Sequence, residues 1–342
     1  MMKISAPATK RRPTIADIAE RAAVSAATVS NALTGSRPVD ADTGARIAAI
    51  ATELGYMPNL RARSLRTGRA DTIALVSSMP FAIAGGRARM GFLMEIAGAA
   101  AVRALESGVA LILVPPLQTS RAPLRDLQID GALVVEPLAN DPDIAWLQRR
   151  GLPAVAIGKA RDMPDVPFVD LRSFDGTMLL LRHLRTQGAR HIGLIVGAES
   201  RHSHAEAVRA YESFNAKGQA QHHVSFVPEA GGEPAARGAA HDLLQRHPQI
   251  DALLVTVDVF AVGARAAAAE LGIDIPGRLK LATRYDGIHA SECVPPLTVL
   301  NLHLEQVATA AVEMLLDQIA GKKIRKSVNA PQPTLKPRAS SE

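Results

Sequence analysis

The stretch Val24-Ser-Ala-Ala-Thr-Val-Ser-Asn-Ala-Leu-Thr-Gly35 has the pattern of a short helix with a defined start and end. The Ser25 hydroxyl can cap the first turn, and Gly35 can adopt the left-handed backbone that ends a helix. Between them, Val29, Ala32 and Leu33 fall on one helical face. The stretch therefore predicts a helix over residues 26–33 that packs against a neighbour through this face.

A second helix is predicted directly before this stretch. Thr14 starts it, and Asp17, three residues later, completes an approximate capping box. Its apolar side chains recur at the spacing of one helical face: Ile15, Ile18, Ala19 and Ala22. A tight turn over residues 23–25 joins the two helices. This order predicts a helix-turn-helix, whose second helix enters the major groove of DNA.

Two more helices are predicted after this unit. One begins after Asp40 or Asp42 and ends before Gly55, with an apolar stripe of Ile47, Ile50, Ala51 and Leu54. It completes a compact bundle of three helices. The other, Leu60–Thr67, follows Asn59 as its cap and has too little apolar surface to fold alone.

The excess of basic over acidic residues in the chain lies entirely in this region. Residues 1–70 contain 11 of the 39 Lys and Arg residues and 5 of the 33 Asp and Glu residues, which leaves 28 of each in the remainder. The whole net charge of +6 therefore lies in the first fifth of the chain. This distribution is typical of a small nucleic-acid-binding module attached to a neutral domain.

Five motifs lie between about Pro13 and Arg69: Thr14-Ile-Ala-Asp-Ile-Ala19, Val24 to Gly35, Leu54-Gly-Tyr56, Pro58-Asn59 and Ala62-Arg-Ser-Leu-Arg-Thr-Gly68. Together they resemble the lactose/galactose-repressor family of bacterial transcription regulators. The resemblance implies a repressor that binds a palindromic operator in double-stranded DNA. A palindrome requires a two-fold protein, so a homodimer is expected.

The start of the predicted recognition helix is expected to contact base edges. Ala26, Ala27 and Thr28 offer methyl groups that suit thymine, and Asn31 can form two hydrogen bonds with adenine. The alternative is that these small residues only allow close helix packing. The family often has Arg at the position of Asn31, so the preferred base there is expected to differ.

Phosphate contacts are expected from the hydroxyl groups at the helix starts and on the exposed side. The candidates are Thr14, Ser25 and Ser30. Simple helix capping is the alternative.

The resemblance gives the linker helix a role in the minor groove. It implies that two such helices, one from each subunit, lie side by side there and wedge Leu65 into the central base step, next to Ala62 and after the cap Asn59. A wedge of this kind unstacks bases to obtain a bent operator. The alternative is that Leu65 packs on the core domain.

From Thr72 onward, short apolar runs alternate with longer amphipathic segments. The runs cover residues 72–77, 109–114, 131–135, 154–157, 191–196, 224–227, 252–255 and 279–282. This alternation predicts parallel βαβ units in an α/β domain. A chain of this length suits two open sheets with a ligand cleft at the carboxyl ends of their strands.

The resemblance extends to this region through Val257-Asp258, Ala261-Val-Gly263, Tyr285-Asp286 and Pro295-Pro-Leu-Thr298. It implies a periplasmic-binding-protein-like α/β core of two doubly wound parallel-sheet subdomains behind an all-α helix-turn-helix headpiece. The expected division is a disordered basic arm (1–12), a DNA-binding domain (13–58), a hinge helix (59–69), a core (70–325) and a flexible tail (326–342). Within the core, the expected N-subdomain covers about 70–169 and 298–325, and the C-subdomain about 170–297.

A carbohydrate-like effector is expected in the cleft, held by residues at the strand ends. The candidates are Phe81, Glu136, Lys159, Arg201 and Asp258. The resemblance places Asp258 where the family binds sugar hydroxyls, and a carboxylate can accept two such bonds. A structural helix cap is the alternative for Asp258.

Two departures from the family suggest a sugar acid or phosphate. Arg172-Ser173 replaces the usual Asp-Asn pair, and Ala207 replaces the usual pocket arginine. Arg172, Arg201 and Arg209 could then bind an anionic group, with plain surface charge as the alternative.

Other classes of function have little support in the sequence. The chain shows no P-loop, no G-x-S-x-G motif and no G-x-G-x-x-G motif after a strand, so an enzyme is not expected. No cofactor is expected, nor a metal at His202, His204, His222 and His223. Single Cys293 is a buried core residue or, alternatively, a reactive thiol. No signal peptide or membrane span is predicted, and a cytoplasmic protein is expected rather than a transport binding protein.

Overall fold

The computed structural model describes residues 13–35, 37–56, 68–84, 91–114, 127–216 and 223–342. Contacts within the chain divide it into two units, residues 1–69 and 70–342. No helix in the described part of the chain is long and apolar enough to cross a membrane. The predicted hinge helix, Leu60–Thr67, and its candidate DNA-binding residues Asn59, Ala62 and Leu65 lie outside the described residues.

The first unit is a bundle of three helices: α1 (Ile15–Ala22), α2 (Ala26–Thr34) and α3 (Ala41–Leu54). Its core contains fully buried Ile18, Val29 and Ile47, one from each helix. Gly35 and Gly55 end α2 and α3 with left-handed backbone (φ 64° and 65°), as their positions in the sequence predict. The helix-turn-helix prediction is confirmed.

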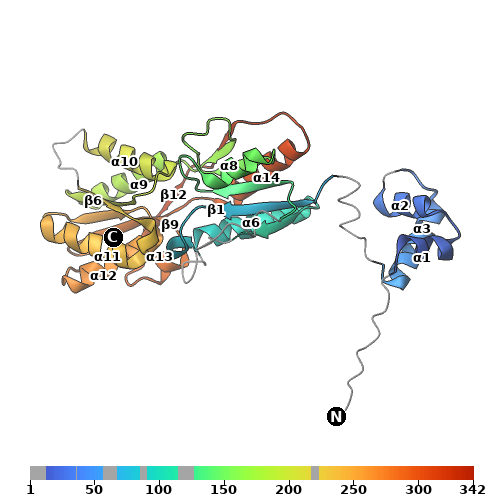
Figure 1. Cartoon of the computed structure of the whole chain (residues 1–342). Helices are drawn as coiled ribbons and strands as arrows, with labels where there is room; N and C mark the ends of the chain where they lie inside the picture. The colour runs from blue at the N-terminus through green and yellow to red at the C-terminus, as the bar shows by residue number, and fades with distance from the viewer. Residues whose placement is uncertain (1–12, 36, 57–67, 85–90, 115–126, 217–222) are drawn as a thin grey trace, which may run out of the picture. The chain divides into compact units, whose positions relative to one another are not determined.

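The second unit contains two six-stranded sheets (Figure 1). The first has the order β11-β5-β4-β3-β1-β2, and all its pairs are parallel. Its strands are β1 (Thr72–Ser77), β2 (Ala110–Leu113), β3 (Gly131–Val135), β4 (Ala154–Ile157), β5 (Phe168–Asp170) and β11 (Ser327–Asn329). Helices α6 (Phe92–Glu106) and α14 (Leu304–Ile319) cover one face, and α8 (Pro142–Arg149) covers the other.

The second sheet has the order β12-β10-β9-β8-β6-β7, and only the pair β10–β12 is antiparallel. Its strands are β6 (Ile192–Gly197), β7 (Val224–Val227), β8 (Ala252–Val255), β9 (Lys280–Tyr285), β10 (Thr298–Asn301) and β12 (Thr334–Lys336). One face packs on α9 (Ser173–Thr186) and α10 (His202–Asn215), the other on α11 (Gly232–Arg246) and α12 (Asp258–Glu270). Short helices α5 (Phe81–Ala84) and α13 (Ile288–Glu292) complete the unit, with a 3-10 turn η2 (Glu229–Gly231). The predicted pair of doubly wound subdomains is confirmed.

The chain crosses between the two sheets three times. The crossings lie between β5 and α9, between β10 and α14, and between β11 and β12. Arg172 and His303 bend the first two crossings with left-handed backbone (φ 50° and 53°). Arg172 Nε also donates to the Ala330 carbonyl at 2.7 Å, which ties the first crossing to the third.

Two expectations about the core are wrong. Residues 298–301 were expected in the N-subdomain, but they form β10 of the second sheet, and the chain returns to the first sheet only with α14. The expected flexible tail, residues 326–342, instead contributes one strand to each sheet. The polar composition of the tail suggested an exposed segment. Its residues Ser340 and Ser341 are nevertheless fully buried, and hydrogen bonds satisfy their hydroxyl groups.

Cys293 packs in the core of the second sheet. Burial raises the pKa of its thiol, which disfavours the reactive thiolate. The core interpretation of this residue is the one that the structure supports.

The integrated tail gives a prediction about stability. Deleting residues 327–342 should lower the thermal midpoint of the core by at least about 5 °C. Several buried hydrogen bonds disappear, such as Thr298 N to Ser340 Oγ (2.8 Å), each contributing about 1 kcal/mol. Deleting residues 1–12 is the control for shortening the chain. Equal midpoints by scanning calorimetry for the two truncated proteins would show that the tail is dispensable.

Candidate functional site

The first turn of α2 is the exposed part of the helix-turn-helix. Ser25, Ala26 and Ala27 are exposed, whereas Val29 is buried and fixes which face of the helix points outward. Ser30 and Asn31 are partly exposed. The small side chains leave the start of α2 open to a flat or grooved partner.

Capping bonds hold the start of both headpiece helices in place. Thr14 forms a full capping box, in which its N–H donates to Asp17 Oδ2 at 2.6 Å and its hydroxyl to the same oxygen at 2.7 Å. Ser25 Oγ accepts from the Thr28 N–H at 3.0 Å, and the two hydroxyl groups lie 2.8 Å apart. Thr14 and Ser25 therefore have the capping role that sequence reasoning gave as the alternative, at positions that remain exposed.

The second unit has a cavity at the carboxyl ends of the strands of both sheets. Glu136 follows β3, Arg201 follows β6, Asp258 follows β8, and all three line the cavity as expected. Two other expected effector residues do not. Phe81 is 43% exposed at the start of α5, and the Lys159 ammonium lies over the Phe168 ring at 5.7 Å.

Arg201 is an internal ion-pair residue rather than an open ligand contact. Its Nε and Nη2 donate to Glu229 Oε1 and Oε2 at 2.8 and 2.7 Å, and the two side chains are only 2% and 1% exposed. Nη1 donates to Ser78 Oγ at 3.1 Å and to the Glu136 carbonyl, and Nη2 donates to the Ser78 carbonyl at 3.3 Å. These bonds use all five guanidinium donors. Because Ser78 and Glu136 follow strands of the first sheet, Arg201 joins the two subdomains across the cavity.

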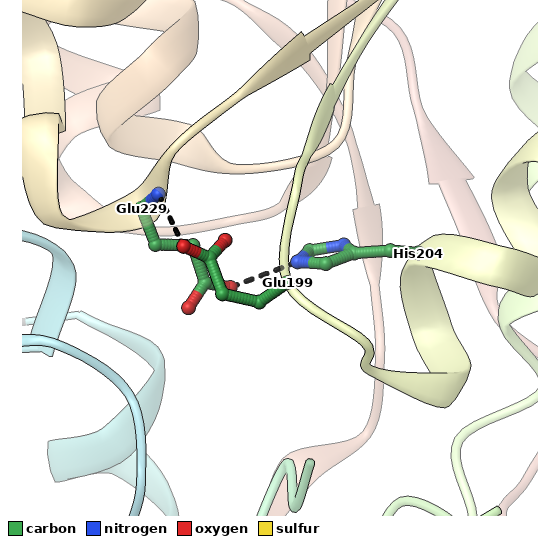
Figure 2. A group of neighbouring side chains, drawn as sticks. All are labelled: Glu199, His204 and Glu229. Carbon is green, nitrogen blue, oxygen red and sulfur yellow. Dashed lines mark hydrogen bonds and ion pairs between the residues drawn. The ribbon is translucent and has the colours of Figure 1, made fainter. Parts of the chain in front are cut away.

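In Figure 2, dashed lines join Glu229 to both His204 and Glu199. His204 Nε2 lies 2.8 Å from Glu229 Oε1, and the Glu229 N–H donates to Glu199 Oε1 at 2.9 Å. Burial would raise the pKa of Glu229, but the hydrogen bonds from His204 and Arg201 outweigh burial and hold that pKa below its usual value. The three residues are close enough for one metal ion, yet the Arg201 guanidinium holds both Glu229 oxygens and would repel a cation. The geometry favours an ion-pair network here.

Glu136 and Asp258 are the carboxylates that face the rest of the cavity. Glu136 has left-handed backbone (φ 47°), and its Oε2 accepts a hydrogen bond from Ser203. Burial raises the pKa of Asp258, against the opposing charge of His289. Both side chains can accept hydrogen bonds from a polar ligand.

Sequence reasoning missed two cavity residues at the end of β9. Arg284 and Tyr285 line the cavity, and the Tyr285 hydroxyl donates to Glu95 Oε2 of α6 at 2.6 Å. The rings of Tyr285 and Phe92 pack in a T-shaped arrangement with their centroids 5.6 Å apart, which gives the cavity an aromatic wall. The apolar run predicted a strand that ends at residue 282, whereas β9 extends to Tyr285. Arg284 was therefore not expected at a strand end.

Of the three arginines suggested as an anion site, Arg201 and Arg209 line a hollow beside the cavity, and all three have partners in the protein. Arg172 bonds to the Ala330 carbonyl and Asp175, and Arg201 is fully engaged. Arg209 is 62% exposed and pairs with Glu206 on the surface of α10. Because each guanidinium already bonds to a group of the protein, the structure does not favour an anion site formed by Arg172, Arg201 and Arg209.

Comparisons with known proteins agree with both units. Residues 14–59 match the model of bacterial regulatory proteins of the lacI family, and residues 181–341 match a periplasmic binding protein-like domain. The chain is 31% identical to the transcriptional repressor PurR of Serratia proteamaculans over 338 residues, covering 94% of this chain and 95% of that protein. It is 28% identical to the regulator CelR of Thermobifida fusca over 325 residues, covering 92% and 94% of the two chains.

Solved structures share the fold. A CelR–cellobiose complex superposes with a TM-score of 0.71 at 24% identity, covering 96% of this chain and all of that chain. The lac repressor dimer bound to operator and the anti-inducer ONPF superposes with a TM-score of 0.81 at 22% identity, covering 97% and 99%.

The Arg201–Glu229 pair gives a prediction about stability and pH. Arg201→Met should destabilise the core by about 3–5 kcal/mol at pH 7, because it leaves a buried carboxylate without its cation. The control Arg209→Met removes an exposed pair and should cost less than about 1 kcal/mol. Urea unfolding measures both.

The pH dependence has a definite sign. In the wild type, the lowered pKa of Glu229 contributes stability that is lost only as the pH falls below 4.5, the ordinary pKa of a glutamate. Without Arg201, burial raises the pKa of Glu229. The carboxylate of the variant then becomes protonated at a higher pH than in the wild type, and protonation removes the cost of an unpaired buried charge. The difference in unfolding free energy should therefore be smaller at pH 5 than at pH 7, and a constant difference would contradict this account.

Proposed function

Because the chain belongs to the lacI family of bacterial regulatory proteins, we propose that it is a homodimeric repressor of a palindromic operator, controlled by a small carbohydrate-like effector. Its coarser character follows from the family: it is a DNA-binding transcription regulator with a sugar-binding-like domain, not an enzyme. The exposed first turn of α2 is the observation that supports DNA recognition most directly. The cavity in the second unit supports an effector.

The proposed DNA contacts begin with α2. Ala26 and Ala27 pack on thymine methyl groups, and Asn31 bonds a base edge, from a helix whose opposite face is fixed by Val29. Thr28 offers a further methyl group to the bases, and the proposed phosphate contacts come from Thr14, Ser25 and Ser30. In the minor groove, the proposed contacts of the hinge helix are Asn59, Ala62 and Leu65.

An apolar stripe on α6 supports the homodimer. Met94, Val102 and Leu105 are 40%, 59% and 67% exposed and recur at helical spacing on one face. Gly98 lies on the same face, and a Cβ added there would meet nothing. Large apolar side chains gathered on an exposed helix face mark a protein interface, and a palindromic operator requires a second copy of this chain.

The effector is proposed to act by changing the relation between the two subdomains. Glu136 comes from the first sheet and Asp258 from the second, so one ligand can bond to both. A ligand that binds one arrangement of the subdomains better than another shifts their equilibrium.

Selection from sheared genomic DNA tests operator recognition. At near-physiological salt, the bound fragments should share a palindrome of roughly 14–20 base pairs, as two half-sites about one helical turn apart require. Leu65→Ala should abolish enrichment and keep effector binding, whereas Asp258→Ala should keep enrichment and lose the response to effector. Binding that is uniform along the genome and only falls with salt would reduce the headpiece to a basic anchor.

The dimer has its own test. Leu105→Glu should convert the dimer to a monomer in light-scattering chromatography and weaken operator binding by at least about tenfold, because it places a charge in an apolar interface. Ile324→Glu changes a side chain that is 53% exposed elsewhere and should leave the dimer intact. A dimeric Leu105→Glu protein would rule out this surface of α6.

A further inference from the structure

The guanidinium of Arg284 has two buried nitrogens that make no hydrogen bond within the described part of the chain. Its side chain is only 11% exposed, and it lines the cavity at the carboxyl end of β9. Nε and Nη2 have no hydrogen-bond partner among the described residues. Leaving buried charged donors unsatisfied is costly, so a group that bonds them should bind well.

The two open nitrogens form one edge of the guanidinium. Nε and Nη2 present parallel N–H groups whose spacing matches the two oxygens of a carboxylate. Arg201, in the same cavity, shows this edge in use: its Nε and Nη2 hold the Glu229 carboxylate at 2.8 and 2.7 Å. A single hydroxyl group would satisfy only part of the equivalent edge of Arg284.

The nearest acidic group does not fill this edge. Glu136 Oε1 lies 3.9 Å from Arg284 Nη2, beyond hydrogen-bond distance, and also has no partner among the described residues. The Thr256 hydroxyl is buried and equally without one. Glu136 and Asp258 are hydrogen-bond acceptors, so a ligand here needs donors as well as an anionic group.

We propose that Arg284 anchors the carboxylate of the effector, and that the effector is a small hydroxycarboxylate whose hydroxyl groups bond to Glu136 and Asp258. This inference rests on the proposed function, since it names the chemical class of that effector. It also moves anion recognition from Arg172, Arg201 and Arg209, which have protein partners, to a residue whose donors are open.

The test compares acids with their neutral parents. Sodium gluconate, galactonate, glucuronate and galacturonate are titrated against glucose and galactose by calorimetry, with sodium chloride matching the ionic strength. At least one acid should bind the full-length wild type at least about tenfold more tightly than its parent sugar, and Arg284→Gln should remove that preference. Arg284→Lys keeps the positive charge but lacks the two parallel N–H groups, so it should keep only part of the preference for the acid. Arg149→Gln, which changes an exposed residue of α8 that lines neither this cavity nor the hollow beside it, should behave as the wild type.

Thermal unfolding without ligand separates a binding role from a structural one. Because its Nε and Nη2 make no hydrogen bond to described residues, Arg284→Gln should unfold at the wild-type temperature or above. A lower midpoint together with unchanged acid binding would show that Arg284 serves as the structural ion-pair partner of Glu136, and would overturn the inference. So would a panel in which no acid is preferred to its parent sugar.

Operator binding without ligand keeps the two proposals apart. Wild type and Arg284→Gln should both enrich the palindrome equally. Enrichment with no preference for acids rejects only the role of Arg284, whereas absence of enrichment by the wild type, both without ligand and with each acid and sugar added, rejects the proposed function itself.

Discussion

The ion pair of Arg201 and Glu229 is the interaction on which the second unit depends. Moving two charges out of water is expensive, and the structure offsets that expense by using every guanidinium donor and by adding His204 to the carboxylate. Because Ser78 and the Glu136 carbonyl accept from the same guanidinium, the pair also closes the subdomains on each other. The charges of Arg201 and Glu229 cancel each other. The other polar groups that line the cavity surround this pair: Arg284, Asp258 and Glu136 Oε1.

The subdomains can turn at the three crossings between the sheets, and Leu302, which lies in one of these crossings, lines the same cavity as Arg201. Arg172 and His303 adopt backbone angles that side chains rarely favour, and the Arg172 bond to Ala330 links two crossings. A motion of one subdomain must therefore move the crossings together. An effector that competes with or reinforces the Arg201 bonds would bias that motion, which is the differential contact that allosteric control requires.

The sequence predicted much of the fold because burial leaves a periodic record. Eight strands of the second unit lie at or near their predicted positions, since each is an apolar run between amphipathic helices. Strands β5, β11 and β12 have three residues each, too few to show such a pattern, and the four-residue strand β10 was not predicted either. For the site, the strand-end rule placed Glu136 and Asp258. The fate of Arg201 depends on Glu229, 28 residues later, and Arg284 sits in a strand interrupted by polar residues, so neither could be assigned from local pattern.

Strand β1 gives a physical connection between the cleft and the junction of the two units. It begins at Thr72, directly after the first unit, where Asp130 accepts from the N–H groups of Ala70 and Thr72 at 2.7 and 3.3 Å. It ends at Ser77, next to the Ser78 groups that Arg201 holds. Four residues of β1 are paired with β2 and five with β3, so the strand moves with its sheet as a rigid element. One paired strand therefore joins the residues that Arg201 holds to the segment that leads to the first unit, as the proposed control by an effector requires.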